Sequence, residues 1–234
     1  MEMENKERVI TESKYRIEEK YTMASDDANL LEGRISRFLQ PDMHSEGEYK
    51  ISSLYFDDYN MSSFHDSLDG NPQRRKYRIR IYNDSLECIK LEVKVKNYNK
   101  GYKLSSQISK DEMRKLISGE IILDSGRMDD SRTLFNLAIK TRNIRPVVII
   151  NYFRKAYMYA IGTTRITFDQ MIGYSGFVEN YGRKEAYRLL NLETIMELKY
   201  TEVLPVFIRE IVENEKMIRV SNSKYALCVE GMGE

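Results

Sequence analysis

The sequence predicts an α+β fold in which a mainly antiparallel sheet curls into a β-barrel and amphipathic helices pack outside it. Two observations lead to this prediction. Several segments alternate polar and apolar residues with the period of two that is typical of strands. The stretches between them show the helical period and carry capping residues at their ends. With 234 residues, four scattered prolines and no Ser/Gly-rich linker, the chain is expected to form a single domain over residues 1–234.

The alternation is clearest in seven segments. Side chains of a strand point alternately to its two faces, so most of these segments have one apolar face and one charged face. The expected strands are Arg16–Thr22, Lys50–Asp57, Arg74–Tyr82, Leu86–Lys96, Val147–Ile161, Arg165–Asp169 and Thr194–Tyr200. Asp57 and Asp58 are expected to end a strand and to cap the helix that follows it.

Amphipathic helices are expected between the strands. Ser25 can cap a helix that runs to about Leu39. Its apolar stripe would comprise Leu30, Leu31, Ile35 and Phe38. Ser109 and Glu112 can form a capping box for a helix over Lys110–Ser118. Further helices are expected over Ser131–Thr141 and from Pro205 to about Asn214, and a loop with short helical pieces over Met171–Arg188.

Composition excludes several classes of protein. The formal net charge is only +1, with 37 basic and 36 acidic residues, so the broad basic footprint of a nucleic-acid-binding protein is absent and no nucleic acid partner is expected. No window approaches the ~20 consecutive apolar residues that span a bilayer, and no signal peptide is recognisable. Cys88 and Cys228 are interpreted as buried small hydrophobes in a reducing compartment. We therefore expect a cytoplasmic protein without a transmembrane segment.

The charged strand faces are unusually rich in cations. On one strand, four basic residues share a face opposite Tyr77, Ile79 and Ile81. These four are Arg74, Lys76, Arg78 and Arg80. On the next strand, the residues that share a face are Lys90, Glu92, Lys94 and Lys96. A Glu-x-Lys unit recurs at strand positions as Glu18/Lys20, Glu92/Lys94 and Glu197/Lys199.

Two interpretations of these faces remain open. They can be the solvated side of an amphipathic antiparallel sheet, which is a common arrangement. However, they consist almost wholly of Arg, Lys and Glu, and like charges so close together repel unless anions offset them. A sheet that encloses these faces would form a cationic bore suited to a chain of phosphates. Arginine and lysine would bind the phosphate oxygens, and glutamates would hold Mg²⁺ or Mn²⁺.

Common catalytic signatures are missing. The sequence has neither a G-x-x-x-x-G-K-[ST] phosphate loop nor a G-x-G-x-x-G dinucleotide fingerprint. With only two histidines, no Ser/His/Asp or Cys/His nucleophile set stands out.

Eight blocks, in this order, resemble one known family. They are RIEEKY (16–21), SLYFDD (53–58), RKYRIRIY (75–82), LEVKVK (91–96), YFRKAY (152–157), RITFD (165–169), MELKY (196–200) followed by LP (204–205), and SKY (223–225). Together they resemble the VTC (vacuolar transporter chaperone) polyphosphate polymerase domain. This domain belongs to the triphosphate tunnel metalloenzymes of the CYTH-like superfamily, whose strands close into a tunnel lined by basic residues.

The resemblance implies a role for individual residues. Catalytic contacts to the phosphate chain are implied for Lys20, Arg78, Arg80, Lys94, Arg154, Arg165, Lys199 and Lys224. Further substrate contacts are expected from Lys103, Tyr152, Ser223 and Lys76. Glu197 matches the metal-binding glutamate of the family, with Glu18 and Glu92 as additional candidates for Mn²⁺ or Mg²⁺.

The implied reaction transfers the γ-phosphoryl group of ATP to a growing polyphosphate chain inside the tunnel. The expected partners are ATP, polyphosphate, and inorganic phosphate or pyrophosphate. Two alternatives remain open at this point, namely hydrolysis of tripolyphosphate or nucleoside triphosphates in the same tunnel and a non-catalytic polyphosphate-binding module. The sequence leaves the metal preference, the polymer length and the oligomeric state undetermined.

Overall fold

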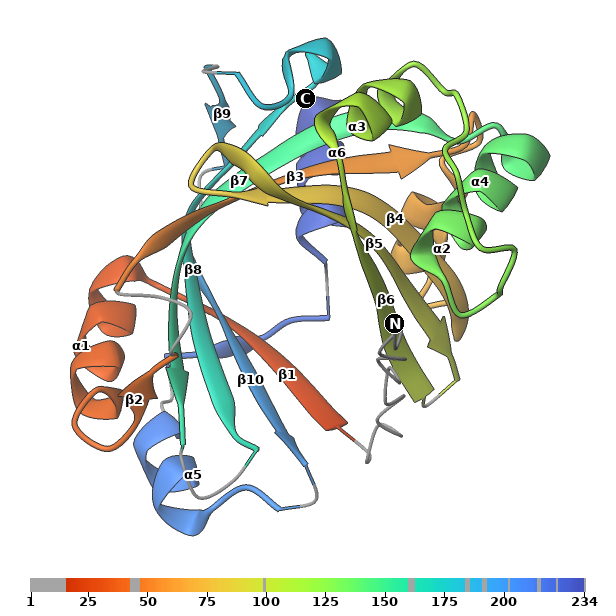
Figure 1. The fold of residues 1–234 in the computed structure, drawn as a ribbon. Helices are drawn as coiled ribbons and strands as arrows, with labels where there is room; N and C mark the ends of the chain where they lie inside the picture. The colour runs from red at the N-terminus through yellow and green to blue at the C-terminus, as the bar shows by residue number, and fades with distance from the viewer. Residues whose placement is uncertain are drawn as a thin grey trace, which may run out of the picture.

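The computed structural model describes residues 16–42, 47–98, 100–159, 163–183, 186–190, 193–201, 203–213, 216–221 and 223–233. Within these residues, eleven strands form one strongly curved antiparallel sheet, and helices pack around it (Figure 1). The strand order is β11-β1-β10-β8-β7-β3-β4-β5-β6, with β2 beside β7 and β9 beside β8. The α+β class and the antiparallel pairing are therefore as expected.

All seven expected strands are present. The long strands are β1 (Arg16–Met23), β3 (Tyr49–Asp57), β4 (Gln73–Tyr82), β5 (Ser85–Asn97), β6 (Lys100–Ile108), β7 (Arg145–Met158), β8 (Arg165–Ser175) and β10 (Thr194–Thr201). The short ones are β2 (Gln40–Pro41), β9 (Arg188–Leu189) and β11 (Ile218–Arg219). β6 was not predicted, and β8 continues through Met171 to Ser175, where a loop was expected. The predicted strand end at Ile161 lies outside the described residues.

The predicted closure of the barrel is wrong. β6 and β11 lie at the two ends of the sheet, and no backbone ladder joins these ends in the part of the chain that the structure describes. β11 pairs with Tyr21 and Thr22 of β1, and thereby occupies part of the edge that a closing strand would need. Among the described residues, side chains bridge the gap, since Nζ of Lys94 on β5 lies 3.4 Å from a carboxylate oxygen of Glu18 on β1. The sheet is thus a curved, open trough.

The helices mostly match the expected segments. They are α1 (Ser25–Ile35), α2 (Ser62–Leu68), α3 (Lys110–Ile117), α4 (Ser131–Arg142), α5 (Val206–Val212) and α6 (Lys224–Met232), with a 3₁₀ turn at Val178–Asn180. The capping box of α3 is present, and Gly119 follows the helix with a φ of +81°. Asp57 and Asp58 accept hydrogen bonds from backbone N–H groups at the start of α2, as predicted. The expected end of α5 at Asn214 lies outside the described residues.

Two expectations need correction, namely the extent of α1 with its buried stripe and the burial of Cys88, and one helix is additional. α1 ends at Ile35, and Leu30 and Phe38 are 66% and 59% exposed because the buried stripe runs through Ala28, Leu31 and Ile35. α6 was not predicted. Cys228 is buried on this helix, whereas Cys88 is exposed on the sheet.

The apolar faces of the strands point outward, towards most of the helices. α3 and α4 cover β4 and β5 through a core that includes Ile79, Leu91 and Phe135. α1 and α5 cover β8 and β10 through a second core around Phe168 and Leu198. α6 is an exception to the expected outer packing, because it packs on the concave side against inward-facing tyrosines of β3 and β7. The charged faces of the strands are therefore left to line the trough.

Candidate functional site

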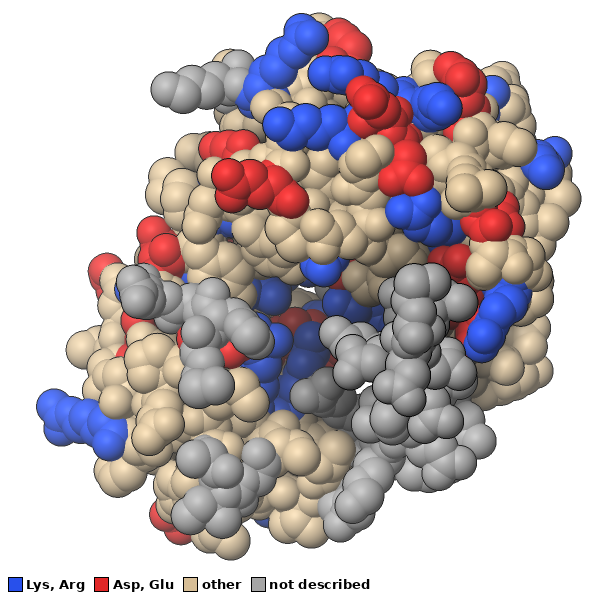
Figure 2. Space-filling view, viewed as in Figure 1, with Lys and Arg blue, Asp and Glu red and all other residues tan. Residues whose placement is uncertain are grey.

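The charged strand faces converge inside the curved sheet. Figure 2 shows a central hollow in which Lys and Arg side chains predominate, with Asp and Glu among them. The opposite residues of the same strands, such as Ile79 and Val93, are fully buried beneath the helices. The alternation predicted from the sequence is thus confirmed, and the interpretation as a solvated outer face is excluded for these strands. The site consists of three clusters of charges, which lie on different strands and on α6.

The first cluster surrounds Glu92 of β5, and we call it the Glu92 cluster (Arg78, Arg80, Glu92 and Lys103). Arg78 places both Nε and Nη2 2.7 Å from Oε2 of Glu92, while Nζ of Lys103 lies 2.7 Å from Oε1. Nε of Arg80 is 3.9 Å away. Burial opposes ionisation of Glu92, but the positive charges of Arg78, Arg80 and Lys103 outweigh it and hold the pKa far below its usual value. Glu92 therefore acts as a permanent counter-anion for three cations.

Hydrogen bonds fix the two arginines of this cluster. Arg78 donates from Nη1 to the hydroxyl of Tyr55 at 2.9 Å. Arg80 donates to Oγ of Ser53 at 3.1 Å and to the hydroxyl of Tyr152 at 3.2 Å. Burial opposes the charge of Arg78, yet Tyr55 and Glu92 raise its pKa above the usual value. Both guanidinium groups are therefore charged and held in place without a ligand.

The second cluster surrounds Asp169 of β8, which is completely buried, and we call it the Asp169 cluster (Arg154, Asp169 and Lys224). Arg154 of β7 forms a bidentate pair with Asp169 at 2.6 and 2.7 Å, and Nζ of Lys224 lies 2.5 Å from the same carboxylate. Burial opposes ionisation of Asp169, but Arg154 and Lys224 lower its pKa. The ring of Tyr152 lies 5.3 Å from the Arg154 guanidinium carbon and 5.1 Å from the Lys224 ammonium group. Since Tyr152 also accepts from Arg80, it connects this cluster with the Glu92 cluster.

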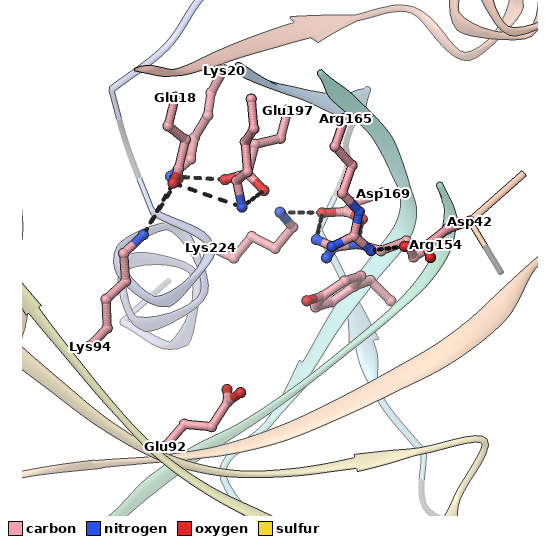
Figure 3. Close-up of polar contacts among 12 residues, drawn as sticks. Glu18, Lys20, Asp42, Glu92, Lys94, Arg154, Arg165, Asp169, Glu197 and Lys224 are labelled. Carbon is pink, nitrogen blue, oxygen red and sulfur yellow. Dashed lines mark hydrogen bonds and ion pairs between the residues drawn. The ribbon is translucent and has the colours of Figure 1, made fainter. Parts of the chain in front are cut away.

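The third cluster lies on the adjacent strands β1 and β10, and we call it the Glu18/Glu197 cluster (Glu18, Lys20, Glu197 and Lys199). Lys199 is 2.9 Å from Glu197 and 3.8 Å from Glu18. Lys20 is 3.5 Å from Glu18 and 3.9 Å from Glu197. Lys94 reaches Glu18 from the opposite wall (Figure 3). Burial opposes ionisation of Glu197, but a hydrogen bond with Glu18 and the charges of Lys199 and Lys20 hold its pKa well below the usual value.

The remaining expected residues occupy different positions. Arg165 pairs with Asp42 at 2.7 Å, and Figure 3 shows it beside Arg154. The hydroxyl of Ser223 accepts a hydrogen bond from the backbone of Ala226 and caps α6. Lys76 is partly buried on β4.

Lys76 stands out because none of the described carboxylates pairs with its charge. No ion pair joins Lys76 to a carboxylate among the described residues. Burial, together with the cations Lys20, Arg74 and Lys94, lowers the pKa of Lys76 to about 7. An anion bound nearby would favour its protonated form.

The described residues contain a carboxylate pair that suits a divalent cation. They include no group of three or more His, Cys, Asp and Glu side chains arranged to hold a metal ion. Glu18 and Glu197, however, lie close together, since Lys20 and Lys199 each contact both carboxylates. Two carboxylates suffice for Mg²⁺ or Mn²⁺ when phosphate and water oxygens complete the coordination, so the pair fits such an ion. Glu92 lies apart from this pair, within its own cluster of cations (Figure 3).

Sequence reasoning did not assign four residues that organise the site. Asp169 and Asp42 are the anions that hold Arg154 and Arg165, and Tyr55 and Ser53 orient the arginines of β4. Within the expected strand Arg165–Asp169, the period of two puts Asp169 on the same face as Arg165. It gave no sign of Arg154 and Lys224 as its partners, because these lie on other elements.

The family to which the chain belongs follows from a comparison with protein families. The VTC domain family matches residues 15–232, which is nearly the whole chain. The chain belongs to the VTC domain family. This confirms the resemblance that the eight sequence blocks indicated. No curated protein matches this VTC domain.

A solved structure shares this fold at low sequence identity. A putative adenylate cyclase from Bacillus halodurans is 13% identical to this VTC domain, with a TM-score of 0.52. The match covers 81% of this chain and 82% of that protein. A putative adenylate cyclase from Vibrio parahaemolyticus is 11% identical, with a TM-score of 0.45 and 85% of each chain covered. None of the helices in the described segments has the length and apolar character needed to cross a bilayer.

Proposed function

We propose that this VTC domain is a metal-dependent polyphosphate polymerase that transfers the γ-phosphoryl group of ATP to a polyphosphate chain. The observation that carries the proposal is the convergence of cations from opposite walls on one hollow that also contains a carboxylate pair. Arg78, Arg80 and Lys103 come from one wall, and the Asp169 and Glu18/Glu197 clusters come from the other. A bound triphosphate would thus be surrounded by positive charge on several sides.

In the proposed reaction, a terminal oxygen of the polyphosphate attacks the γ-phosphorus of ATP. The bond between this phosphorus and the β,γ-bridging oxygen breaks, and ADP leaves with the bond's electron pair. The polyphosphate becomes one phosphoryl unit longer. Such a transfer needs neutralised charge and aligned reactants more than a covalent group from the protein. This agrees with the sequence, in which no Ser/His/Asp or Cys/His nucleophile set stands out.

The fixed arginines would hold the phosphate oxygens that carry charge in the transition state. Arg78 and Arg80 are already oriented by Glu92, Tyr55, Ser53 and Tyr152, so little ordering remains to be done when substrate binds. Lys224 and Arg154 would act in the same way from the other wall. A divalent ion bound at Glu18 and Glu197 would supply additional positive charge to the phosphate oxygens. Lys199 and Lys20 neutralise these carboxylates when no such ion is bound.

The reaction products test the proposal directly. The protein is incubated with ATP and Mn²⁺ or Mg²⁺, and the products are separated by chain length while ADP and free phosphate are measured. The proposal predicts long chains and one ADP for each phosphoryl unit added. Release of free phosphate without formation of chains would contradict the polymerase proposal and identify the protein as a hydrolase. Binding of polyphosphate without any turnover of ATP would also contradict the proposal and indicate a non-catalytic polyphosphate-binding module.

A variant of Glu197 separates catalysis from binding. Glu197→Gln keeps the size of the side chain but removes a charge from the carboxylate pair, so turnover should fall by at least about 100-fold while polyphosphate still binds. Glu210→Gln, on the exposed side of α5, is the matched control and should behave like the unchanged protein. Full turnover by Glu197→Gln would contradict the assigned role of the pair.

A further inference from the structure

The cationic faces of β4 and β5 continue past the three clusters, towards the beginning of β4. Along this stretch, cations stand directly opposite each other on neighbouring strands. Arg74 pairs in register with Lys96, Lys76 with Lys94, and Lys94 with Lys103 of β6. Cross-strand partners have Cβ atoms only about 4.5–5.5 Å apart, and like charges in such pairs destabilise a sheet. The sheet keeps several such pairs side by side.

In the Glu92 cluster, a carboxylate offsets the positive charge of its neighbours. The cations along this stretch have no such compensation from the described carboxylates. Arg74 donates to the backbone oxygen of Asn71 at 2.7 Å, and within the described residues no ion pair links Arg74, Lys76 or Lys96 to a carboxylate. Glu18 reaches only Lys94 there. Positive charge therefore remains in excess at this end of the trough.

Cations of the opposite wall face the same stretch. Burial lowers the pKa of Lys96, and the charges of Arg74, Lys94 and Lys20 lower it further. Lys20 belongs to β1 and also lowers the pKa of Lys76. The repulsion thus acts across the trough as well as along the sheet, which an extended anion lying between the two walls would relieve.

We propose that Arg74 and Lys96, together with Lys76 and Lys94, form a track that binds the part of a long polyphosphate chain lying beyond the triphosphate position. This inference rests on the proposed function, and it assigns Arg74 and Lys96 to binding of the polymer. Arg78 lies four positions after Arg74 on β4, which is about 13 Å along an extended strand. A chain held at Arg78 and Arg80 must extend well past its first phosphoryl units to reach Arg74 and Lys96.

Polyphosphate fits this track better than a single-stranded nucleic acid does. Proteins that bind single strands without sequence preference place aromatic side chains between their basic residues, and the bases stack on them. The inward-facing positions of the track are Arg74, Lys76, Lys94 and Lys96, all of them cationic. They suit a backbone made only of phosphate.

The test compares two ligands of different length. The double variant Arg74→Gln/Lys96→Gln is titrated with tripolyphosphate and with long-chain polyphosphate at fixed ionic strength. We expect the affinity for the long chain to fall about tenfold, or about 1.4 kcal/mol, while the affinity for tripolyphosphate stays within about twofold. The matched control, Arg75→Gln/Lys115→Gln, removes the same charges from exposed positions outside the trough and should change neither affinity.

The possible outcomes separate this inference from the function on which it rests. Equal losses for both ligands, or no loss for either, would overturn the track and leave the proposed function intact. If the protein without substitutions bound neither tripolyphosphate nor long-chain polyphosphate, both the track and the proposed function would be overturned. Equally tight binding of a single-stranded oligonucleotide, lost in the same double variant, would show a general polyanion surface and also overturn the inference. Thermal unfolding of each variant confirms that a loss of affinity does not reflect a loss of fold.

Discussion

The cations of the site differ in how their charge is compensated. Arg78 and Arg154 each form close pairs with a buried carboxylate, Glu92 or Asp169. If such a cation is removed, the buried carboxylate loses its main partner, and this typically costs about 3–5 kcal/mol. Lys76 has no such partner in the described part of the chain, and its neighbours Lys20, Arg74, Lys94 and Arg78 are all positive. The arginine pairs therefore contribute to stability, whereas Lys76 opposes folding when it is charged.

This difference predicts a pH-dependent effect of replacing Lys76. Its pKa is about 7 in the folded protein and 10.5 as an ordinary lysine. Below about pH 7 both states are protonated, so the folded state bears the full cost of the charge. Between about pH 7 and 10.5 the unfolded state binds more protons, and the stability of the unchanged protein rises with pH. Lys76→Met should therefore raise the free energy of unfolding on the order of 1–3 kcal/mol near pH 6, and by progressively less at higher pH.

Urea denaturation at about pH 6 and about pH 9 measures this effect. Lys115→Met serves as the control, because Lys115 is exposed on α3 and lies outside the site. A gain from Lys76→Met that is the same at both values of pH would show that the lowered pKa of Lys76 has no thermodynamic consequence.

At the scale of elements, alternation made most of the sheet predictable. β4 and β5 have almost unbroken period-two patterns, and their boundaries were predicted within a residue or two. β6 was missed because Gly101 and the Ser105–Ser106 pair interrupt its pattern, although Leu104 and Ile108 keep the correct spacing. α6 was missed because it is short and contains Gly231, which weakens a helical pattern.

The position of α6 changes the interpretation of Ser223. The resemblance implies that Ser223 contacts substrate, while the structure places its hydroxyl at the N-cap of α6, next to Lys224. Ser223→Ala should destabilise the protein by about 1 kcal/mol, because it removes the cap. It should also weaken polyphosphate binding, because Lys224 begins the first turn of the helix that the cap holds.

Two further substitutions separate the cap from a direct contact. Asparagine is also a good N-cap residue, so Ser223→Asn should restore both the melting temperature and the affinity that Ser223→Ala loses. Ser223→Thr, which retains a hydroxyl, is the control. If Ser223→Asn restored stability but not affinity, the hydroxyl itself would have to contact the ligand.

At the scale of the whole molecule, the sequence predicts which residues face inward but not how they pair. Strand periodicity brings Arg78, Arg154 and Lys199 to inner faces, and the structure agrees. The partners of Arg78 and Arg154 lie on other strands, and Asp169 also pairs with Lys224 of α6, so only the folded chain identifies these pairs. The open edge was likewise unpredictable, since it depends on how β11 meets β1 rather than on any pattern within a strand.

The open trough has a consequence for stability. Near its open edge, charged side chains such as Lys94 and Glu18 connect the walls, and no backbone ladder joins them within the described residues. A phosphate chain that contacts both walls should bind the folded state only, and should add a connection that the empty protein lacks.

A ligand present at 100 times its Kd stabilises the folded state by about 2.7 kcal/mol, which corresponds to a rise in melting temperature of roughly 5–10 °C for a chain of this size. We therefore expect tripolyphosphate to raise the melting temperature by this amount, and potassium chloride at the same ionic strength to raise it far less, because chloride screens the cations without linking the walls. Equal shifts in the two salts would mean that the inward-facing cations respond only to general screening, and that the trough does not bind phosphate as a site.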